Sequence, residues 1–113
     1  MKQYTPLSQA QFQILLSLAD EARHGYGIMQ EVAERSGDKI QLGPGTLYGN
    51  VKKMMADGLI EESQKPAGVE DDDPRRRYYK LTEQGQKVAI AEARRLADMV
   101  HDARIKNLLP EAS

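Results

Sequence analysis

Apolar residues recur at steps of three and four along the N-terminal half of the chain, the spacing that places side chains on one stripe of a helix. Ser8 and Gln11 form a capping box, in which each side chain satisfies a free backbone amide. A first helix is therefore predicted to begin at Ser8 and to end within residues 20–23. A second helix is predicted to follow the glycines of residues 24–27 and to stop at Gly37.

A third helix and a hairpin are predicted next. The helix begins at Pro44, because proline at the first helical position removes no intrahelical hydrogen bond, and it ends at Gly58. Residues 59–63 and 77–81 are short runs rich in branched and aromatic residues, which is typical of strands. The loop between them, about residues 65–74, is longer than a tight hairpin turn.

The last predicted helix carries an apolar seam. Thr82 caps this helix, which is expected to run to about Leu108. Its small and apolar residues step by four, three, four and three, as in a heptad repeat, at Ala89, Ala93, Leu96, Val100 and Ala103. A lone domain would leave such a seam exposed. We therefore predict a homodimer whose interface includes Ala93, Leu96, Val100 and Ala103.

The order helix, helix, helix, strand, strand, helix is the layout of a winged helix-turn-helix, a mainly α fold of the α+β class. We expect a DNA-binding domain over residues 1–81 and a long C-terminal dimerisation helix over residues 82–113. In this layout the third helix enters the major groove and the hairpin reaches the flanking backbone.

Composition narrows the class of protein. At 113 residues, with 40% hydrophobic and 29% charged positions, the chain has the composition of one small domain. It has no cysteine, which excludes disulfides, thiolate metal sites and cysteine nucleophiles. No apolar run resembles a signal peptide or a membrane span, so we expect a cytoplasmic protein without a membrane partner. The net charge of −1 argues against non-specific coating of nucleic acid, although charge is clustered locally.

Four short motifs occur in order along the chain: HGYGI at 24–28, GTLY at 45–48, GLI at 58–60 and RRYYKLTEQG at 76–85. They resemble the successive signatures of the PadR family of transcriptional regulators, and the single final helix resembles the shorter branch of that family. The resemblance implies a homodimeric DNA-binding repressor, often responsive to a small aromatic or drug-like molecule. After Tyr48 the family often has proline and a small residue, whereas this chain has Gly49 and Asn50, so a different base preference is expected.

The third helix supplies candidate DNA contacts at Thr46, Tyr48, Asn50, Lys52 and Lys53. Asparagine pairs with adenine, and lysine binds guanine or phosphate. Two alternatives stay open at this point. In the first, Tyr48 packs on the hairpin instead of contacting DNA. In the second, Lys52 and Lys53 belong to an ordinary solvated helix face.

The wing carries the strongest electrostatic signal, the run Arg75, Arg76 and Arg77, whose guanidinium groups suit phosphate oxygens. Alternation along a strand puts Arg76 on the face of Tyr78 and the other two on the opposite face. The acidic run 70–73 is expected to point outward, because DNA repels it. The alternative is that the arginines are salt-bridge partners of that run.

Tyr26, at the start of the second helix, is a further candidate contact to the DNA backbone. His24 beside it is interpreted as a cap or a backbone contact. His101 has no ligand partner at helical spacing, and residues 71–73 lack the glycine and distal glutamate of a calcium loop. No metal and no cofactor are expected.

Effector pockets in such dimers are typically lined by the first and last helices, and Phe12, Leu15 and Met99 are the candidate residues for one here. The alternative is that these side chains belong to the core.

Two functions of different classes compete. The first is a sequence-specific repressor that binds a palindromic operator in double-stranded DNA as a homodimer and is relieved by a small-molecule effector. The second is a winged-helix protein-interaction module without DNA binding. An enzyme is not expected, because the chain has no serine-histidine-acid set, phosphate-binding glycine loop or nucleotide fingerprint.

Overall fold

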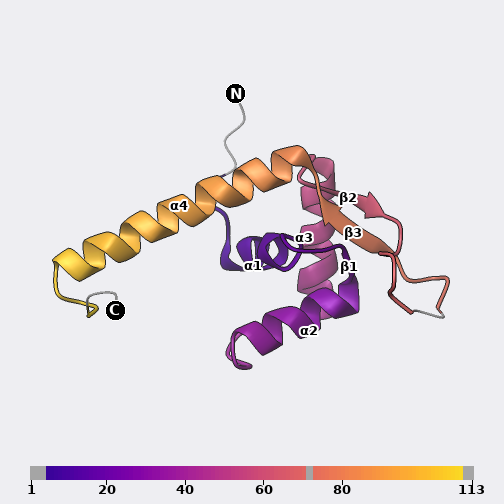
Figure 1. Cartoon of the computed structure of the whole chain (residues 1–113), viewed down its shortest axis with the longest axis horizontal. Coiled ribbons are helices and arrows are strands. Elements are labelled where there is room, and N and C mark those ends of the chain that lie inside the picture. The colour runs from indigo at the N-terminus through magenta and orange to yellow at the C-terminus, as the bar shows by residue number, and fades with distance from the viewer. Residues whose placement is uncertain (1–4, 71–72, 111–113) are drawn as a thin grey trace.

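Four helices and three short strands make up the part of the chain that the computed structural model describes, residues 5–70 and 73–110 (Figure 1). In chain order they are α1 (Gln9–Ser17), β1 (Arg23–His24), α2 (Gly25–Arg35), α3 (Pro44–Ala56), β2 (Ile60–Ser63), β3 (Tyr78–Leu81) and α4 (Glu83–Ile105). The architecture is the α+β winged helix-turn-helix that the sequence predicts.

Side-chain caps fix where the helices begin. The capping box of α1 is present, with Gln11 N donating to Ser8 Oγ at 3.1 Å and Ser8 N donating to Gln11 Oε1 at 3.0 Å. The α4 cap is Thr82, whose Oγ1 accepts from Gly85 N at 2.9 Å. Both caps were expected from the residue types, because Ser and Thr oxygens accept from the free amides of a first helical turn.

Helix α1 ends at Ser17, earlier than the predicted end within residues 20–23. The chain must leave the helix there, because Arg23 and His24 turn back to form a strand. The Nε of Arg23 donates to the carbonyl oxygen of Ser17 at 2.8 Å, so a side chain satisfies one of the last free carbonyls of α1.

The sheet is antiparallel, in the order β1, β3, β2. The predicted hairpin is confirmed as β2 and β3, with Glu62 opposite Tyr79, whereas strand β1 was not predicted. It pairs His24 with Tyr78. A two-residue strand is too short to show the alternation by which strands are recognised in a sequence.

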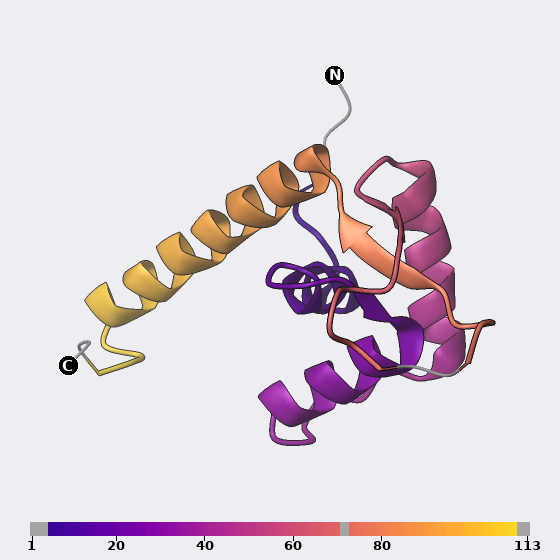
Figure 2. The ribbon, with the colours of Figure 1, turned by 45° about the vertical axis from the view of Figure 1, so that its right-hand side comes forward.

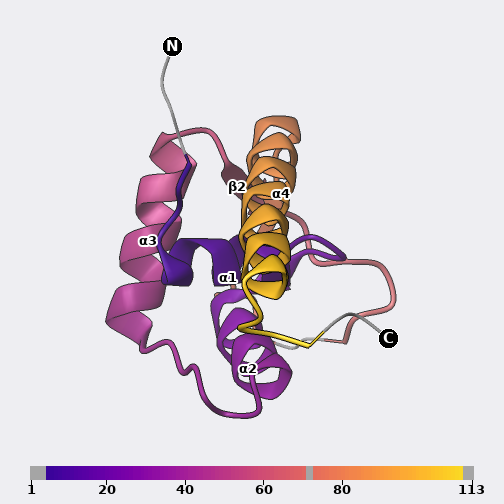
Figure 3. The ribbon, with the colours of Figure 1, turned by 90° about the vertical axis from the view of Figure 1, so that its left-hand side faces the viewer.

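The core forms around α1, which packs against α2, α3 and α4 (Figure 3). Its largest fully buried side chains include Ile14, Leu15, Ile28, Leu47 and Met54. Val88 of α4 belongs to the same cluster, so the first turns of α4 pack with the winged-helix body. The rest of α4 extends away from that body (Figures 1 and 2).

Glycine is required where α4 meets the body. A Cβ atom at Gly85 would lie 2.9 Å from the carbonyl carbon of Leu59 and closer still to its oxygen. Thr82 holds the same turn, since its N–H donates to Leu59 O at 3.1 Å and its hydroxyl donates to Gly58 O at 2.5 Å. The start of α4 is therefore in direct backbone contact with the segment that leads into β2.

Buried polar groups join the elements. Glu92 is 1% exposed, accepts from Leu7 N at 2.6 Å, and pairs with Arg95, whose hydrogen bond holds the pKa of Glu92 below its ordinary value. The buried Ser17 donates to Glu31 Oε2 at 2.7 Å, which links α1 to α2. Leu7, just before α1, is therefore tied to α4, and α1 itself is tied to α2.

Among the residues described, no helix combines the length and the apolar character needed to cross a membrane.

Candidate nucleic-acid interface

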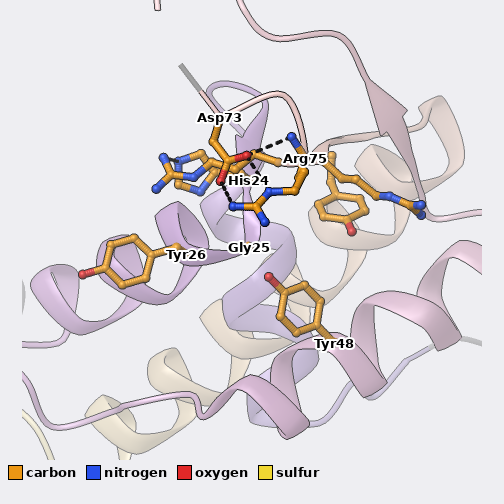
Figure 4. Close-up of a pocket in the computed structure, with 9 residues that line it drawn as sticks. His24, Gly25, Tyr26, Tyr48, Asp73 and Arg75 are labelled. Carbon is orange, nitrogen blue, oxygen red and sulfur yellow. Dashed lines mark hydrogen bonds and ion pairs between the residues drawn. The ribbon is translucent and has the colours of Figure 1, made fainter. Parts of the chain in front are cut away.

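A concave pocket of about 490 Å³ lies where the first turn of α2, helix α3 and the segment before β3 meet (Figure 4). Its lining residues are His24, Gly25, Tyr26, Tyr48, Asp73, Arg75, Arg76, Arg77 and Tyr79. The fold thus gathers Tyr26, Tyr48 and the three wing arginines, which the sequence predicts as DNA contacts from three separate segments.

Tyr48 packs across the first residue of α2. A Cβ atom at Gly25 would lie 2.7 Å from Cζ of Tyr48, and the tyrosine hydroxyl points toward this glycine (Figure 4). The residue as a whole nevertheless stays 47% exposed. Tyr48 therefore has a packing partner in the backbone of α2 and also presents an open face, so packing and contact with a ligand are compatible in this residue.

Tyr79 closes the pocket from the sheet. Burial raises the pKa of its hydroxyl above the ordinary value, and Tyr48 nearby adds to the effect. The side chain therefore stays neutral at any pH at which DNA binding would be measured.

Each wing arginine has a different neighbour. Arg75 Nε lies 3.2 Å from Asp73 Oδ1, and Arg77 Nε lies 3.6 Å from Glu62 Oε1. The side chains of Arg75 and Arg77 are 89% and 74% exposed, so both ion pairs are solvated. Breaking such a pair costs little free energy, so either arginine can leave its carboxylate and bind a phosphate instead. The pair between Arg75 and Asp73 is one with the acidic run, as the salt-bridge alternative expects, whereas Arg77 pairs with Glu62 of β2, outside that run. Asp71 and Asp72 of the predicted acidic run lie outside the described residues.

The other candidates on α3 lie outside the pocket. Leu47, Val51 and Met54 face the core, and Thr46, Lys52 and Lys53 are exposed. Asn50 is half-buried, and its Nδ2 donates to the carbonyl oxygen of Thr46 at 2.8 Å. Its amide oxygen remains to accept a hydrogen bond from outside the helix.

The predicted effector residues are not brought together. Phe12 lines a groove of about 450 Å³ between α1 and α4, together with Leu7, Gln9, Gln13, Arg95 and Leu96 among others. Leu15 is fully buried in the core, because it points from α1 into the body, so it does not line this groove. Met99 is 55% exposed and is also not in the groove lining.

The candidate dimer residues lie on the part of α4 that leaves the body. Ala93 is exposed, Leu96 and Ala103 are half-buried, and Val100 is 38% exposed. Leu96 also lines the groove beside α1. Ala93 and Val100 are therefore open to a second helix in the single chain, whereas Leu96 and Ala103 are partly covered.

The pocket lining includes Gly25, Asp73 and Tyr79, which the sequence did not predict as DNA contacts. Glycine at position 25 has no local signal, because the side chain that requires it, Tyr48, comes from another helix. Within residues 5–70 and 73–110, no group of three or more His, Cys, Asp or Glu residues could hold a metal ion.

Known proteins resemble most of this chain. A family model described as the transcriptional regulator PadR-like family matches residues 14–91. The transcriptional regulator Rv3488 of Mycobacterium tuberculosis is 32% identical over 89 residues, which are 79% of this chain and 77% of that protein. An uncharacterised 37.1 kDa protein in transposon TN4556 of Streptomyces fradiae is 32% identical over 90 residues, 80% of this chain but only 24% of that protein.

The fold is shared with a solved structure of a PadR family transcription regulator from Clostridium difficile R20291. The two superpose with a TM-score of 0.71 at 24% identity, over 84% of this chain and 94% of the other.

Proposed function

Because the chain belongs to the PadR-like family of transcriptional regulators, we propose that it is a homodimeric repressor that binds a two-fold symmetric operator through α3 and the wing. Members of this family are regulators of transcription and not enzymes. The proposed DNA contacts are Tyr26, Thr46, Tyr48, Asn50, Lys52, Lys53 and Arg75 to Arg77.

One observation carries the proposal. Tyr48 of α3 and Arg75 to Arg77 of the wing line the same concave surface, although 26 residues and the whole hairpin loop separate Tyr48 from Arg75 along the chain. Aromatic, hydroxyl and guanidinium groups on one concave face suit the sugar and phosphate of a duplex. A protein-interaction module would have no reason to gather them there.

The proposed dimer forms through α4, which lies within the predicted dimerisation segment 82–113, with Ala93, Leu96, Val100 and Ala103 at the interface. The groove between α1 and α4 supports an effector site. Phe12 and Leu96 supply apolar walls, and Arg95, paired with the buried Glu92, supplies a fixed charge. A molecule bound there would touch the helix that joins the two protomers, which is how we propose that an effector relieves repression.

Changing Arg75, Arg76 and Arg77 together to Ala tests DNA binding. We expect log K for a random duplex to fall less steeply with log salt, by about 0.9 for each phosphate that a protomer no longer neutralises. Affinity should drop similarly on every duplex, because phosphate contacts carry little sequence information. Fluorescence anisotropy at several salt concentrations measures both quantities.

The matched control changes Lys87, Arg94 and Lys106, three exposed cations of α4 and the residue after it, to Ala. This control removes the same number of positive charges at positions away from the wing. It should leave the slope of log K against log salt close to that of the wild type. An unchanged slope in the wing variant would mean that its arginines serve internal ion pairs. A wild type that binds no duplex at low salt would favour the protein-interaction module.

Substitutions on α3 should separate base contacts from phosphate contacts. Asn50→Ala and Lys52→Ala are each expected to cost about 1 to 3 kcal/mol on the preferred operator and much less on random DNA. Tyr48→Phe keeps the ring over Gly25 and removes only the hydroxyl, so its effect isolates hydrogen bonding. Selection from a random duplex pool supplies the operator, on which we expect two half-sites about one helical turn apart or a multiple of it. Equal losses on both kinds of DNA would contradict sequence reading by α3.

A further inference from the structure

Gly25, the first residue of α2, is buried beneath a side chain from another helix. A Cβ atom built on it would lie 2.7 Å from Cζ and 2.9 Å from Cε1 of Tyr48, and closer still to the tyrosine hydroxyl. Real Cβ atoms do not approach other heavy atoms this closely. Any residue other than glycine at position 25 would therefore force the ring of Tyr48 to move, and the hydroxyl end of the ring most of all.

The backbone at position 25 does not itself require glycine. Its φ angle lies outside the left-handed region, in which Gly37, Gly58 and Gly68 are found. At a helical position with an ordinary φ angle, alanine is at least as favourable as glycine. The feature of the structure that requires glycine here is therefore the ring of Tyr48.

The place of Gly25 in the chain ties this contact to the wing. Gly25 directly follows β1, which pairs with strand β3 of the wing. The backbone of Gly25 is therefore anchored to the wing, and the ring of Tyr48 lies against that backbone. The position of the Tyr48 side chain is thus set relative to the wing as well as to α3, which carries it.

We propose that Gly25 is a positioning residue for the DNA contact at Tyr48. It leaves the space in which the tyrosine ring lies, and so keeps the hydroxyl in the pocket that Arg75 and Arg77 also line. The inference rests on the proposed function, in which Tyr48 and the wing arginines bind DNA together. Because Tyr48 is 47% exposed, a ring pushed off Gly25 turns toward solvent and not into the core, and its hydroxyl leaves the pocket.

The test is Gly25→Ala, measured with and without the Tyr48 ring by fluorescence anisotropy on one random duplex. In the wild-type background we expect the affinity to fall about tenfold or more, the usual effect of losing a hydrogen bond to a charged group. The salt slope should stay that of the wild type, because no charge is removed. In the Tyr48→Ala background, Gly25→Ala should change the affinity by less than about twofold, because the side chain that it displaces is gone. A residue with only a structural role would lower the affinity equally in both backgrounds.

Gly27→Ala is the matched control, the same substitution in the same turn of α2. A Cβ atom there would lie 3.4 Å from Cε1 of His24, an ordinary van der Waals contact. The backbone N–H of residue 27 still donates to the cap. This variant should bind the duplex as the wild type does.

A second measurement uses the wild type and does not depend on how a variant folds. Nuclear Overhauser effects should connect the Hα protons of Gly25 to the ring protons of Tyr48. Their absence would overturn the inference, as would a Gly25→Ala variant that keeps the wild-type affinity or that loses the same affinity in both backgrounds. A Tyr48→Ala variant that binds as the wild type does would also overturn it and leave the wing contacts standing. A wild type that binds no duplex would instead remove the proposed function, and this inference with it.

Discussion

A variant with Asp in place of both Leu96 and Val100 is expected to be monomeric. In the proposed dimer these side chains belong to a seam on the part of α4 that extends from the body, where Val100 is 38% exposed in the single chain. Each buried aliphatic side chain contributes about 1.5 to 3 kcal/mol, and the dimer would contain four of them. Because Leu96 is half-buried and Val100 is 38% exposed in the single chain, dimerisation completes only part of that burial, so the expected loss is about 2 to 4 kcal/mol, roughly 30- to 1000-fold in the dissociation constant, before repulsion between carboxylates is added.

Sedimentation velocity at micromolar concentration measures this result. The matched control places Asp at His101 and Ile105, which are exposed and lie on the opposite side of α4 by helical spacing. That variant should remain dimeric. A monomeric wild type, or a dimeric Leu96→Asp/Val100→Asp variant, would show that the second half of α4 is not the interface.

Gly85→Ala is expected to destabilise the fold by about 2 to 3 kcal/mol, the cost of forcing an extra carbon into a filled site. The added methyl group meets backbone atoms of Leu59, which cannot rotate away as a side chain would. Moving that backbone also strains the two hydrogen bonds from Thr82 to residues 58 and 59. Urea unfolding at one fixed protein concentration gives the free energy of unfolding for the assembled protein.

Gly49→Ala is the control for the Gly85 prediction. The same substitution there enters open space in the interior of α3, so the gain in helix propensity should stabilise the protein by about 1 kcal/mol. Opposite signs at the two positions are the expected result. A neutral or stabilising Gly85→Ala would mean that α4 can shift away from Leu59 at little cost.

Features with local signals were predictable from the sequence. Ser8 and Gln11, Pro44 and Thr82 mark helix starts through the hydrogen bonds of a single turn, and the structure has these starts. The two hairpin strands also carry their own residue preferences. Each of these signals lies within a few residues of the helix start or strand that it specifies, so it can be recognised without knowing any tertiary contact.

Features that depend on distant residues were not predictable. Glu92 looks like an ordinary charged position on a helix surface, yet it is buried because Leu7 N and Arg95 satisfy its oxygens. The end of α1 depends on Arg23 reaching back to Ser17 O. Leu15, a candidate for an effector pocket, shares its helical spacing with the core and is fully buried there. Periodicity finds an apolar stripe but does not say which part of it stays open.

Because the first turn of α4 packs on the backbone of Leu59, the rest of this helix extends from the body as a rigid arm. A helix of 23 residues is about 34 Å long at 1.5 Å per residue, and its near end is held by Gly85 and Thr82 while its far half is free of the body. Because the buried Glu92 also ties α4 to Leu7, the arm that extends beyond the body is residues 93–105, about 20 Å long, and a tilt of about 5° moves its far end by about 2 Å. In the proposed dimer, where each body is held at the end of such an arm, slight rotations at the hinge would be magnified into changes in the distance between the two α3 helices.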